Sequence, residues 1–87
     1  MNPRRVVYAP RAERDLNALP ASDRSEIMDA VKAWARGEPH VDVKKLTGVR
    51  PPQWRIRVGR WRALLDCPKS EIARVLRVLD RKDAYRR

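Results

Sequence analysis

The chain has 87 residues, of which 43% are hydrophobic and 37% are charged, and it contains a single cysteine. This length suits one small domain, residues 1–87, and the composition excludes a wholly disordered chain. One cysteine cannot form an internal disulfide, and the first thirty residues resemble neither a signal peptide nor a membrane span, so we expect a reduced, cytoplasmic protein.

The first half of the chain predicts a strand followed by two helices. Residues 5–9 are short and β-rich, and the amphipathic stretch 10–19 that follows is ended by Pro20. Ser22 is the predicted N-cap of a second helix, which stops near Gly37. The expected buried stripe of this second helix consists of Ile27, Ala30, Val31 and Trp34.

The second half predicts three strands after a loop. Residues 38–52 read as a loop because of their prolines and Gly48, and strands are expected at 53–58, 61–67 and 71–79. This order, β-α-α-β-β-β, predicts an α+β fold with a helical hairpin packed on one face of a mainly antiparallel four-stranded sheet. The first and last strands are expected to be neighbours, and the other face of the sheet is expected to be free.

The net charge of +10 is concentrated in the second half of the chain. Residues 1–40 carry 7 basic and 6 acidic side chains, whereas residues 41–87 carry 14 basic and 5 acidic ones. Such a surface attracts phosphate whatever the base sequence, which favours a nucleic-acid partner. A basic surface that only aids solubility or docks an acidic protein is the alternative.

The predicted strand 53–58 alternates apolar and polar side chains. One row is Trp54, Ile56 and Val58; the other carries Arg55 and Arg57, and Arg62 follows the turn at Gly59. Because like charges on paired strands repel, this row indicates an anionic partner. Trp54 and Trp61 could stack on bases if exposed, but the alternation favours the core for both.

Familiar catalytic arrangements are missing from the sequence. The three glycines are isolated, and His40 and Cys67 make no metal-ligand set, so we expect no cofactor and no metal. Nucleophilic triads have no supporting spacing either. His40 reads as an exposed loop residue. Lys44 and Lys45 read equally well as solvated lysines or as phosphate contacts.

The remaining candidates for chemistry are four arginines, Arg55, Arg57, Arg62 and Arg81, and Tyr85, which lies four residues after Arg81. Guanidinium groups bind phosphate bidentately and stay protonated, so they could hold a scissile phosphate and neutralise the charge that develops on it. Tyr85 could stack on a base. The side chains expected to contact RNA are Lys44, Lys45, Arg55, Arg60, Arg77 and Lys82.

Several short segments, each weak alone, occur in a telling order. They are Val7-Tyr8-Ala9-Pro10-Arg11-Ala12, Asp15-Leu16, Leu19-Pro20, Lys44-Lys45-Leu46-Thr47-Gly48, Trp54-Arg55-Ile56-Arg57-Val58-Gly59, Trp61-Arg62, Val75-Leu76-Arg77-Val78 and Asp80-Arg81-Lys82-Asp83-Ala84-Tyr85-Arg86. In this order and spacing the chain resembles the RelE/ParE superfamily of bacterial toxin–antitoxin toxins, and specifically its RelE-like branch. The resemblance covers nearly the whole chain.

The resemblance implies the toxin of a type II toxin–antitoxin system. RelE-like toxins cleave messenger RNA in the ribosomal A site, with the RNA's own 2′-hydroxyl attacking the adjacent phosphate. The family's basic pair falls on Arg55 and Arg57, its transition-state arginine on Arg62, its late-chain arginine on Arg81 and its near-terminal tyrosine on Tyr85. The catalytic residues implied are Arg57, Arg62, Arg81 and Tyr85.

Three positions depart from the family pattern. In the best-known members the pair at Arg55 and Arg57 is lysine, which can accept a proton when its pKa is depressed, whereas arginine does not do so readily. Histidine is common at the position of Asp80. The chain therefore has no obvious general base, and we predict weak activity or strict dependence on the ribosome.

The resemblance also implies partners and leaves two rival functions open. The partners are the ribosome, messenger RNA and a cognate antitoxin, usually acidic, which wraps the toxin as an extended strand and helix, possibly in a heterotetramer; no membrane is implied. One rival is a ParE-like toxin that binds DNA gyrase and cuts no RNA. The other is a non-catalytic member whose basic face only binds its antitoxin or nucleic acid.

Overall fold

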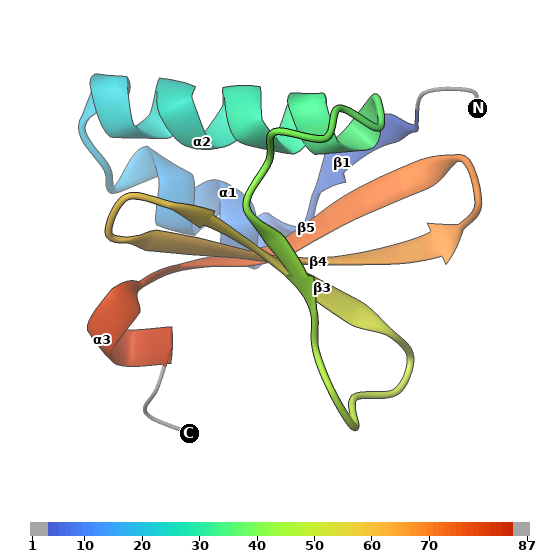
Figure 1. Cartoon of the computed structure of the whole chain (residues 1–87). Helices are drawn as coiled ribbons and strands as arrows, with labels where there is room; N and C mark the ends of the chain where they lie inside the picture. Colours follow the sequence, from blue (N-terminus) through green and yellow to red (C-terminus); the bar gives the residue numbers. More distant parts are fainter. Residues whose placement is uncertain (1–3, 85–87) are drawn as a thin grey trace.

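A computed structural model describes residues 4–84 as one mixed sheet with helices packed around it (Figure 1). The elements are β1 (Arg5–Tyr8), α1 (Pro10–Asn17), α2 (Ala21–Ala35), β2 (Val43–Lys45), β3 (Gln53–Val58), β4 (Trp61–Lys69), β5 (Ile72–Asp80) and α3 (Arg81–Ala84). The strand order is β1-β5-β4-β3-β2, and only the β1–β5 pair is parallel. The predicted α+β fold and the pairing of the first strand with the last are confirmed.

The sheet has five strands, and the prediction of four was wrong. The additional strand, β2, lies within the stretch 38–52 that was predicted to be a loop. Three residues beside prolines and a glycine give no periodic signal of their own. β2 exists because it pairs antiparallel with β3, with Lys44 opposite Arg55 and Lys45 opposite Trp54.

The connection between the two helices also differs from the prediction. α2 begins at Ala21, so Ser22 lies inside the helix, and no side chain caps its first turn. Arg24 on α2 instead reaches back to α1. Its guanidinium donates to the carbonyls of Leu16 and Leu19, both at 3.1 Å, and so satisfies carbonyls at the end of α1. This contact fixes the short turn between the helices.

β4 extends past the turn that was predicted at residues 68–70. The turn lies instead at Ser70 and Glu71, and Pro68 stands inside the strand. The register between β4 and β5 shifts between Asp66 and Lys69. Proline has no N–H to donate to a ladder, and an irregularity of this kind is where a sheet accommodates it.

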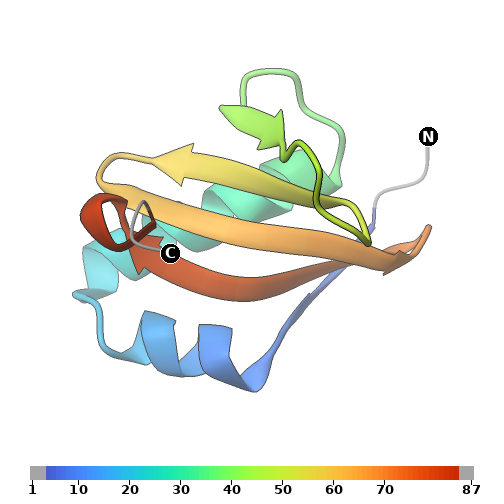
Figure 2. The same cartoon turned by 90° about the horizontal axis from the view of Figure 1, so that it is seen from below.

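The core lies between α2 and the sheet. Ile27 and Val31 of α2 are fully buried against Ile56, Leu65 and Val75 of the three central strands. α1 packs along β5, so both helices lie on the same side of the sheet (Figure 1). Seen from below, α3 lies on the opposite side, against β4 and β5 (Figure 2). The predicted helical hairpin on one face is therefore present, and α3 occupies part of the other face.

Residues 4–84 contain neither a membrane-spanning helix nor a cluster of metal ligands. No helix in this range is long and apolar enough to cross a membrane. Nor does the range bring together three His, Cys, Asp or Glu side chains in a way that could hold a metal ion.

Asp15 closes the part of β5 that β1 leaves open. β1 pairs only with residues 72–75 of β5, so the backbone beyond them faces α1. There the carboxylate of Asp15 accepts the N–H of Val78 at 2.9 Å and Nε of Arg77 at 2.8 Å. Partial burial alone would raise the pKa of Asp15, but these hydrogen bonds and the charges of Arg77 and Arg11 outweigh it and lower that pKa.

Asp15→Asn is expected to reduce the free energy of unfolding at pH 7 by about 1 kcal/mol, because a charged acceptor is lost. A carboxyl with a lowered pKa contributes stability above its unfolded pKa and loses it as the pH falls through the folded one. The difference between Asp15→Asn and the native chain should therefore shrink below about pH 4. Urea unfolding at pH 7 and pH 3 measures it, with the exposed Asp29→Asn as control. An equal difference at both pH values would contradict the expectation.

Candidate nucleic-acid interface

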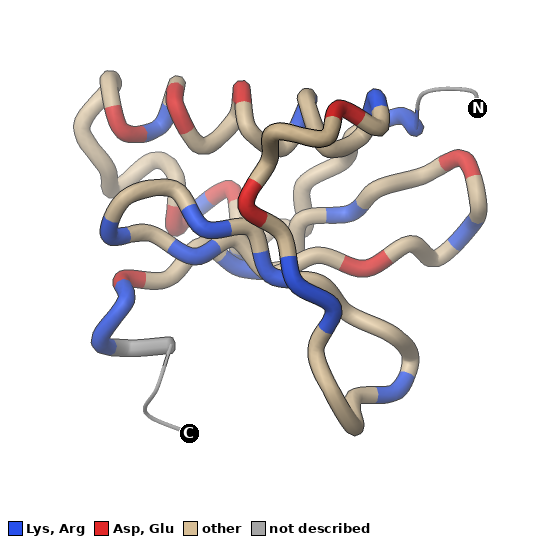
Figure 3. The backbone as a smooth tube through the Cα atoms, viewed as in Figure 1, with Lys and Arg blue, Asp and Glu red and all other residues tan. Residues whose placement is uncertain are grey.

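Four basic side chains share the sheet face opposite α2. Residues directly opposite each other on antiparallel strands point to the same side of a sheet. Lys44 of β2 is opposite Arg55 of β3, and Arg57 of β3 is opposite Arg62 of β4, while Ile56 between the two arginines faces the core. Figure 3 shows these basic segments of β2, β3 and β4 gathered at the centre of the molecule. We call these four residues the basic face.

Arg62 is the buried member of the basic face. It is only 2% exposed, and its Nη1 donates to the carbonyls of Gly59 at 3.3 Å and Trp61 at 3.2 Å. Its Nε has no hydrogen-bond partner and its guanidinium no carboxylate within residues 4–84. A guanidinium removed from water with a donor to spare interacts strongly with an anion.

Arg55 repeats this arrangement on the neighbouring strand. It is half-buried, and its Nε is likewise without a partner in the described part of the chain. Arg57, two residues further along β3, is exposed. The basic face therefore combines unsatisfied donors below the surface with an accessible cation at it. Guanidinium groups form strong, charge-assisted hydrogen bonds with phosphate oxygens.

Arg81 joins the basic face from the far end of the chain. It is exposed at the start of α3, and its backbone N–H donates to the carbonyl of Arg60 at 2.7 Å. Arg60 belongs to the β3–β4 turn, whose Gly59 carbonyl accepts from Arg62. The fold thus brings Arg57, Arg62 and Arg81 to one end of the sheet.

Two further predicted site residues follow Arg81 in the sequence, Lys82 and Tyr85. Lys82 follows Arg81 on α3 and is exposed. Tyr85 lies outside the described residues, so its predicted role stays a prediction.

Two of the predicted RNA contacts are engaged in ion pairs of the protein itself. Nε of Arg60 donates to Asp80 at 2.9 Å, and Nε of Arg77 donates to Asp15 at 2.8 Å. Their carboxylate partners neutralise much of the charge that a phosphate would meet. No sequence pattern indicates these pairs, because 20 and 62 residues separate the partners.

Lys45 is directed away from the basic face. It lies opposite Trp54, and its Nζ is 6.0 Å from the centre of that indole ring. Trp54 in turn contacts Trp34 of α2, with ring centres 5.7 Å apart and planes tilted by 47°. Trp61 is half-buried and packs against the core. Both tryptophans therefore serve packing, which is the role that the alternation favoured.

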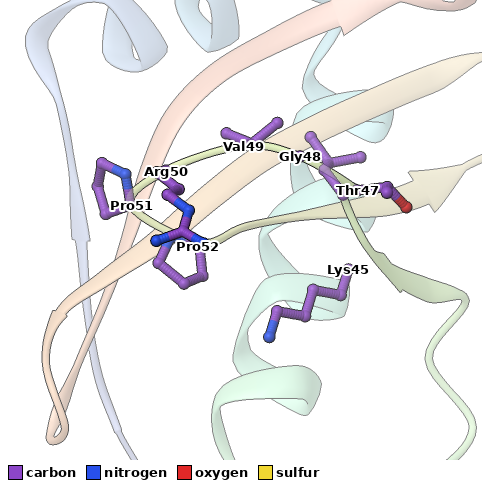
Figure 4. A pocket seen from close by; sticks show the side chains of 8 residues that line it. Lys45, Thr47, Gly48, Val49, Arg50, Pro51 and Pro52 are labelled. Carbon is purple, nitrogen blue, oxygen red and sulfur yellow. The ribbon is translucent and has the colours of Figure 1, made fainter.

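One hollow of the structure lies away from the basic face. It measures about 660 Å³, is open to solvent and is lined by residues of the β2–β3 loop, from Lys45 to Pro52 (Figure 4). This loop joins the end of β3 remote from the Gly59 turn. The hollow is accordingly separate from the end of the sheet where Arg57, Arg62 and Arg81 meet.

His40 and Asp42 lie near Arg57, which the sequence did not indicate. Together with Asp29 they line one hollow of about 290 Å³ that Arg57 also lines. The N–H of Arg57 donates to the carbonyl of Asp42 at 2.9 Å, which continues the β2–β3 pairing by one step. His40 is exposed, as predicted, and its Nδ1 is 3.7 Å from Glu38. No sequence spacing connects these residues to Arg57.

Comparison with solved structures shows that the chain has a RelE-like toxin fold, as the resemblance implied. It is similar to the RelB–RelE antitoxin–toxin complex from Methanococcus jannaschii, with 25% identity, a TM-score of 0.75, and coverage of 92% of this chain and 95% of that one. For the toxin–antitoxin complex RelBE2 from Mycobacterium tuberculosis the corresponding values are 25%, 0.75, 92% and 100%. For the RelE–RelB complex from Pyrococcus horikoshii they are 21%, 0.70, 92% and 97%.

No model of a protein family matches the chain, and no curated protein matches it.

Proposed function

We propose that this chain is the toxin of a type II toxin–antitoxin system and a ribosome-dependent endoribonuclease that cleaves messenger RNA. The observation that carries the proposal is Arg62, a buried guanidinium with an unpaired Nε, directly opposite the exposed Arg57. A structural role alone does not require two arginines side by side without an acid between them. The RelE-like fold supports the same conclusion.

The proposed reaction is a transesterification at one phosphate of the RNA. The 2′-oxygen attacks the adjacent phosphorus, the bond from phosphorus to the 5′-oxygen breaks, and a 2′,3′-cyclic phosphate and a 5′-hydroxyl result. Arg57 and Arg62 hold the phosphate oxygens and stabilise the negative charge that grows on them. The 2′-hydroxyl loses its proton to solvent water, and the leaving 5′-oxygen takes one from solvent water while Arg81 donates a hydrogen bond to that oxygen. Tyr85 stacks on a base. Lys44 and Arg55 hold the neighbouring phosphate.

The basic face supports phosphate binding better than it supports proton abstraction. Arginine stays protonated at any accessible pH, so neither Arg57 nor Arg55 serves as a general base. The rate must come from ordering of the RNA by the ribosome and from electrostatic stabilisation. The purified chain is therefore expected to leave free RNA largely intact and to cut messages on programmed ribosomes. Robust cleavage of free RNA would contradict this expectation.

The proposed partners are the ribosome, its messenger RNA and a cognate antitoxin, which places the protein in the cytoplasm. The similar structures are toxin–antitoxin complexes. The +10 net charge suits an acidic antitoxin segment, because opposite charges steer association. A heterotetramer of two toxins and two antitoxins is the proposed assembly.

Arg81→Ala tests the proposed activity in cells. After brief induction, primer extension should map cuts within translated codons for the native chain, and these cuts should disappear in Arg81→Ala. The variant should keep its fold and its antitoxin binding, because Arg81 is exposed. Arg36→Ala, an exposed arginine at the end of α2, is the matched control and should cut normally. Cuts that persist in Arg81→Ala would remove Arg81 from the site.

A second candidate is a binding protein that has kept the fold without the chemistry. The arginines at positions 55 and 57 favour it, because they grip phosphate without accepting a proton. Absence of both growth arrest and cuts would establish this candidate. Growth arrest with intact messages would instead indicate a gyrase inhibitor, and a plasmid supercoiling assay would then decide.

A further inference from the structure

Asp80 connects three parts of the molecule at the end of the sheet where Arg81 lies. It is the last residue of β5, and its Oδ1 accepts the backbone N–H of Lys82, in the first turn of α3, at 3.2 Å. Its Oδ2 accepts Nε of Arg60 in the β3–β4 turn at 2.9 Å and also receives Nη2 of the same guanidinium. One carboxylate therefore ties α3 to the turn.

Arg60 completes this connection from the other side. Its carbonyl accepts the N–H of Arg81 at 2.7 Å, and its guanidinium lies over the indole ring of Trp61, 5.2 Å from the ring centre. Trp61 and Asp80 are themselves paired across β4 and β5. Arg81 therefore follows Asp80 in the chain and is hydrogen-bonded to Arg60, and these two residues form an ion pair with each other.

The Asp80–Arg60 pair matters because α3 is too short to be stable without contacts to the rest of the protein. A four-residue helix has too few internal hydrogen bonds to offset the entropy of ordering it. Its placement depends on contacts with the body of the protein, and the side-chain contacts that reach its backbone within residues 4–84 come from Asp80. A carboxylate suits this place, since it accepts an N–H at a helix start and a guanidinium at the same time.

We propose that the Asp80–Arg60 pair is a positioning device that holds Arg81 at the β3–β4 turn, whose Gly59 carbonyl also accepts from Arg62. This inference rests on the proposed function, because it assigns the pair a task in the same reaction. Asp80 does not touch the RNA in this arrangement. It acts through Arg81, whose reach to the leaving oxygen depends on the place where α3 begins.

Asp80→Ala separates this inference from a simple charge effect, because the two predict opposite changes. If Arg60 only bound RNA, removing its acidic partner would free a cation and strengthen binding to the ribosomal complex. If the pair positions Arg81, the same variant lowers kcat by about 10-fold or more with KM nearly unchanged. Asp80→Asn, which keeps an oxygen acceptor for the Lys82 N–H and loses the charge, should fall between the native chain and Asp80→Ala.

A double-mutant cycle shows whether Asp80 acts through Arg81. In an Arg81→Ala background, adding Asp80→Ala should cause no further loss of cleavage, whereas in an Arg57→Ala background the two losses should multiply. A general loss of stability would lower activity in both backgrounds. Glu38→Ala is the matched control, because Arg36 donates to Glu38 at 2.7 Å in a similar exposed pair that involves neither the β3–β4 turn nor α3.

Amide hydrogen exchange gives a readout that needs no cleavage. The N–H groups of Arg81 and Lys82 should exchange faster in Asp80→Ala and Arg60→Ala than in the native chain, and at the native rate in Glu38→Ala. Unchanged exchange, or a rise in kcat in Asp80→Ala, would overturn the positioning role while leaving the proposed ribonuclease intact. A native chain that cuts nothing on ribosomes would overturn the proposed function, and the catalytic role of the pair with it.

Discussion

Arg62→Met is expected to reduce cleavage on the ribosome by about 10²–10³-fold and, at the same time, to raise the free energy of unfolding by about 1 kcal/mol. Arg62 is 2% exposed, and its only acceptors within residues 4–84 are two carbonyls at 3.2 and 3.3 Å. A buried cation destabilises the fold when few hydrogen bonds and no carboxylate offset its loss of hydration. Methionine fills a similar volume without a charge. Activity and stability should therefore move in opposite directions.

Urea unfolding and single-turnover cleavage on programmed ribosomes measure the two effects. Arg57→Met is the matched control, because Arg57 is exposed and directly opposite Arg62 on β3. It should lose cleavage and leave stability within about 0.5 kcal/mol of the native chain. If Arg62→Met instead unfolded more easily by 2 kcal/mol or so, Arg62 would be a structural clasp of the β3–β4 turn rather than a phosphate ligand.

Ile56→Ala is expected to lower the free energy of unfolding by about 2–5 kcal/mol, which is a large part of the total for a domain of this size. Ile56 is 0% exposed at the centre of β3, beneath α2, and the Arg55 and Arg57 side chains on either side of it point to the opposite face. The cavity left by the substitution would loosen the strand that carries both arginines. Antitoxin binding should partly restore the melting temperature, because a ligand of the native state stabilises it.

Thermal unfolding followed by circular dichroism measures this loss. Val43→Ala is the control, because Val43 lies on the edge strand β2 and is 36% exposed. That substitution should change stability by no more than about 0.5 kcal/mol. Similar losses for both variants would show that the core does not centre on β3.

The parts of the fold that follow a local period could be predicted from the sequence. The bounds of β3 agree with the prediction, because alternation over 53–58 and a glycine immediately after it mark a strand and a turn. β2 could not be predicted, because its three residues become a strand only through their partner on β3. Pro68 misled the prediction of the last turn, because a register shift that no sequence pattern reports accommodates it.

The candidate site divides in the same way. Arg55, Arg57 and Arg62 are close in sequence on a predicted hairpin, so their shared face could be inferred from the pleat. The ion pairs of Arg60 with Asp80 and of Arg77 with Asp15 could not, since they depend on how the β3–β4 turn and α1 meet β5. Burial of Arg62 was equally hidden, because the alternation places it on the polar side of its strand.

The parallel pairing of β1 with β5 has a consequence for how fast the protein folds. Arg5 finds its partner in Ile72, so the contact closes a loop that contains almost the entire chain. The entropy of that closure must be spent before β1 gains any hydrogen bond, and domains rich in such distant pairings fold slowly, typically in milliseconds to seconds. During synthesis, β1 has no strand to pair with until β5 has been made. Until β5 has been made, the core between α2 and the sheet stays incomplete, because Val75 of β5 is one of its fully buried members.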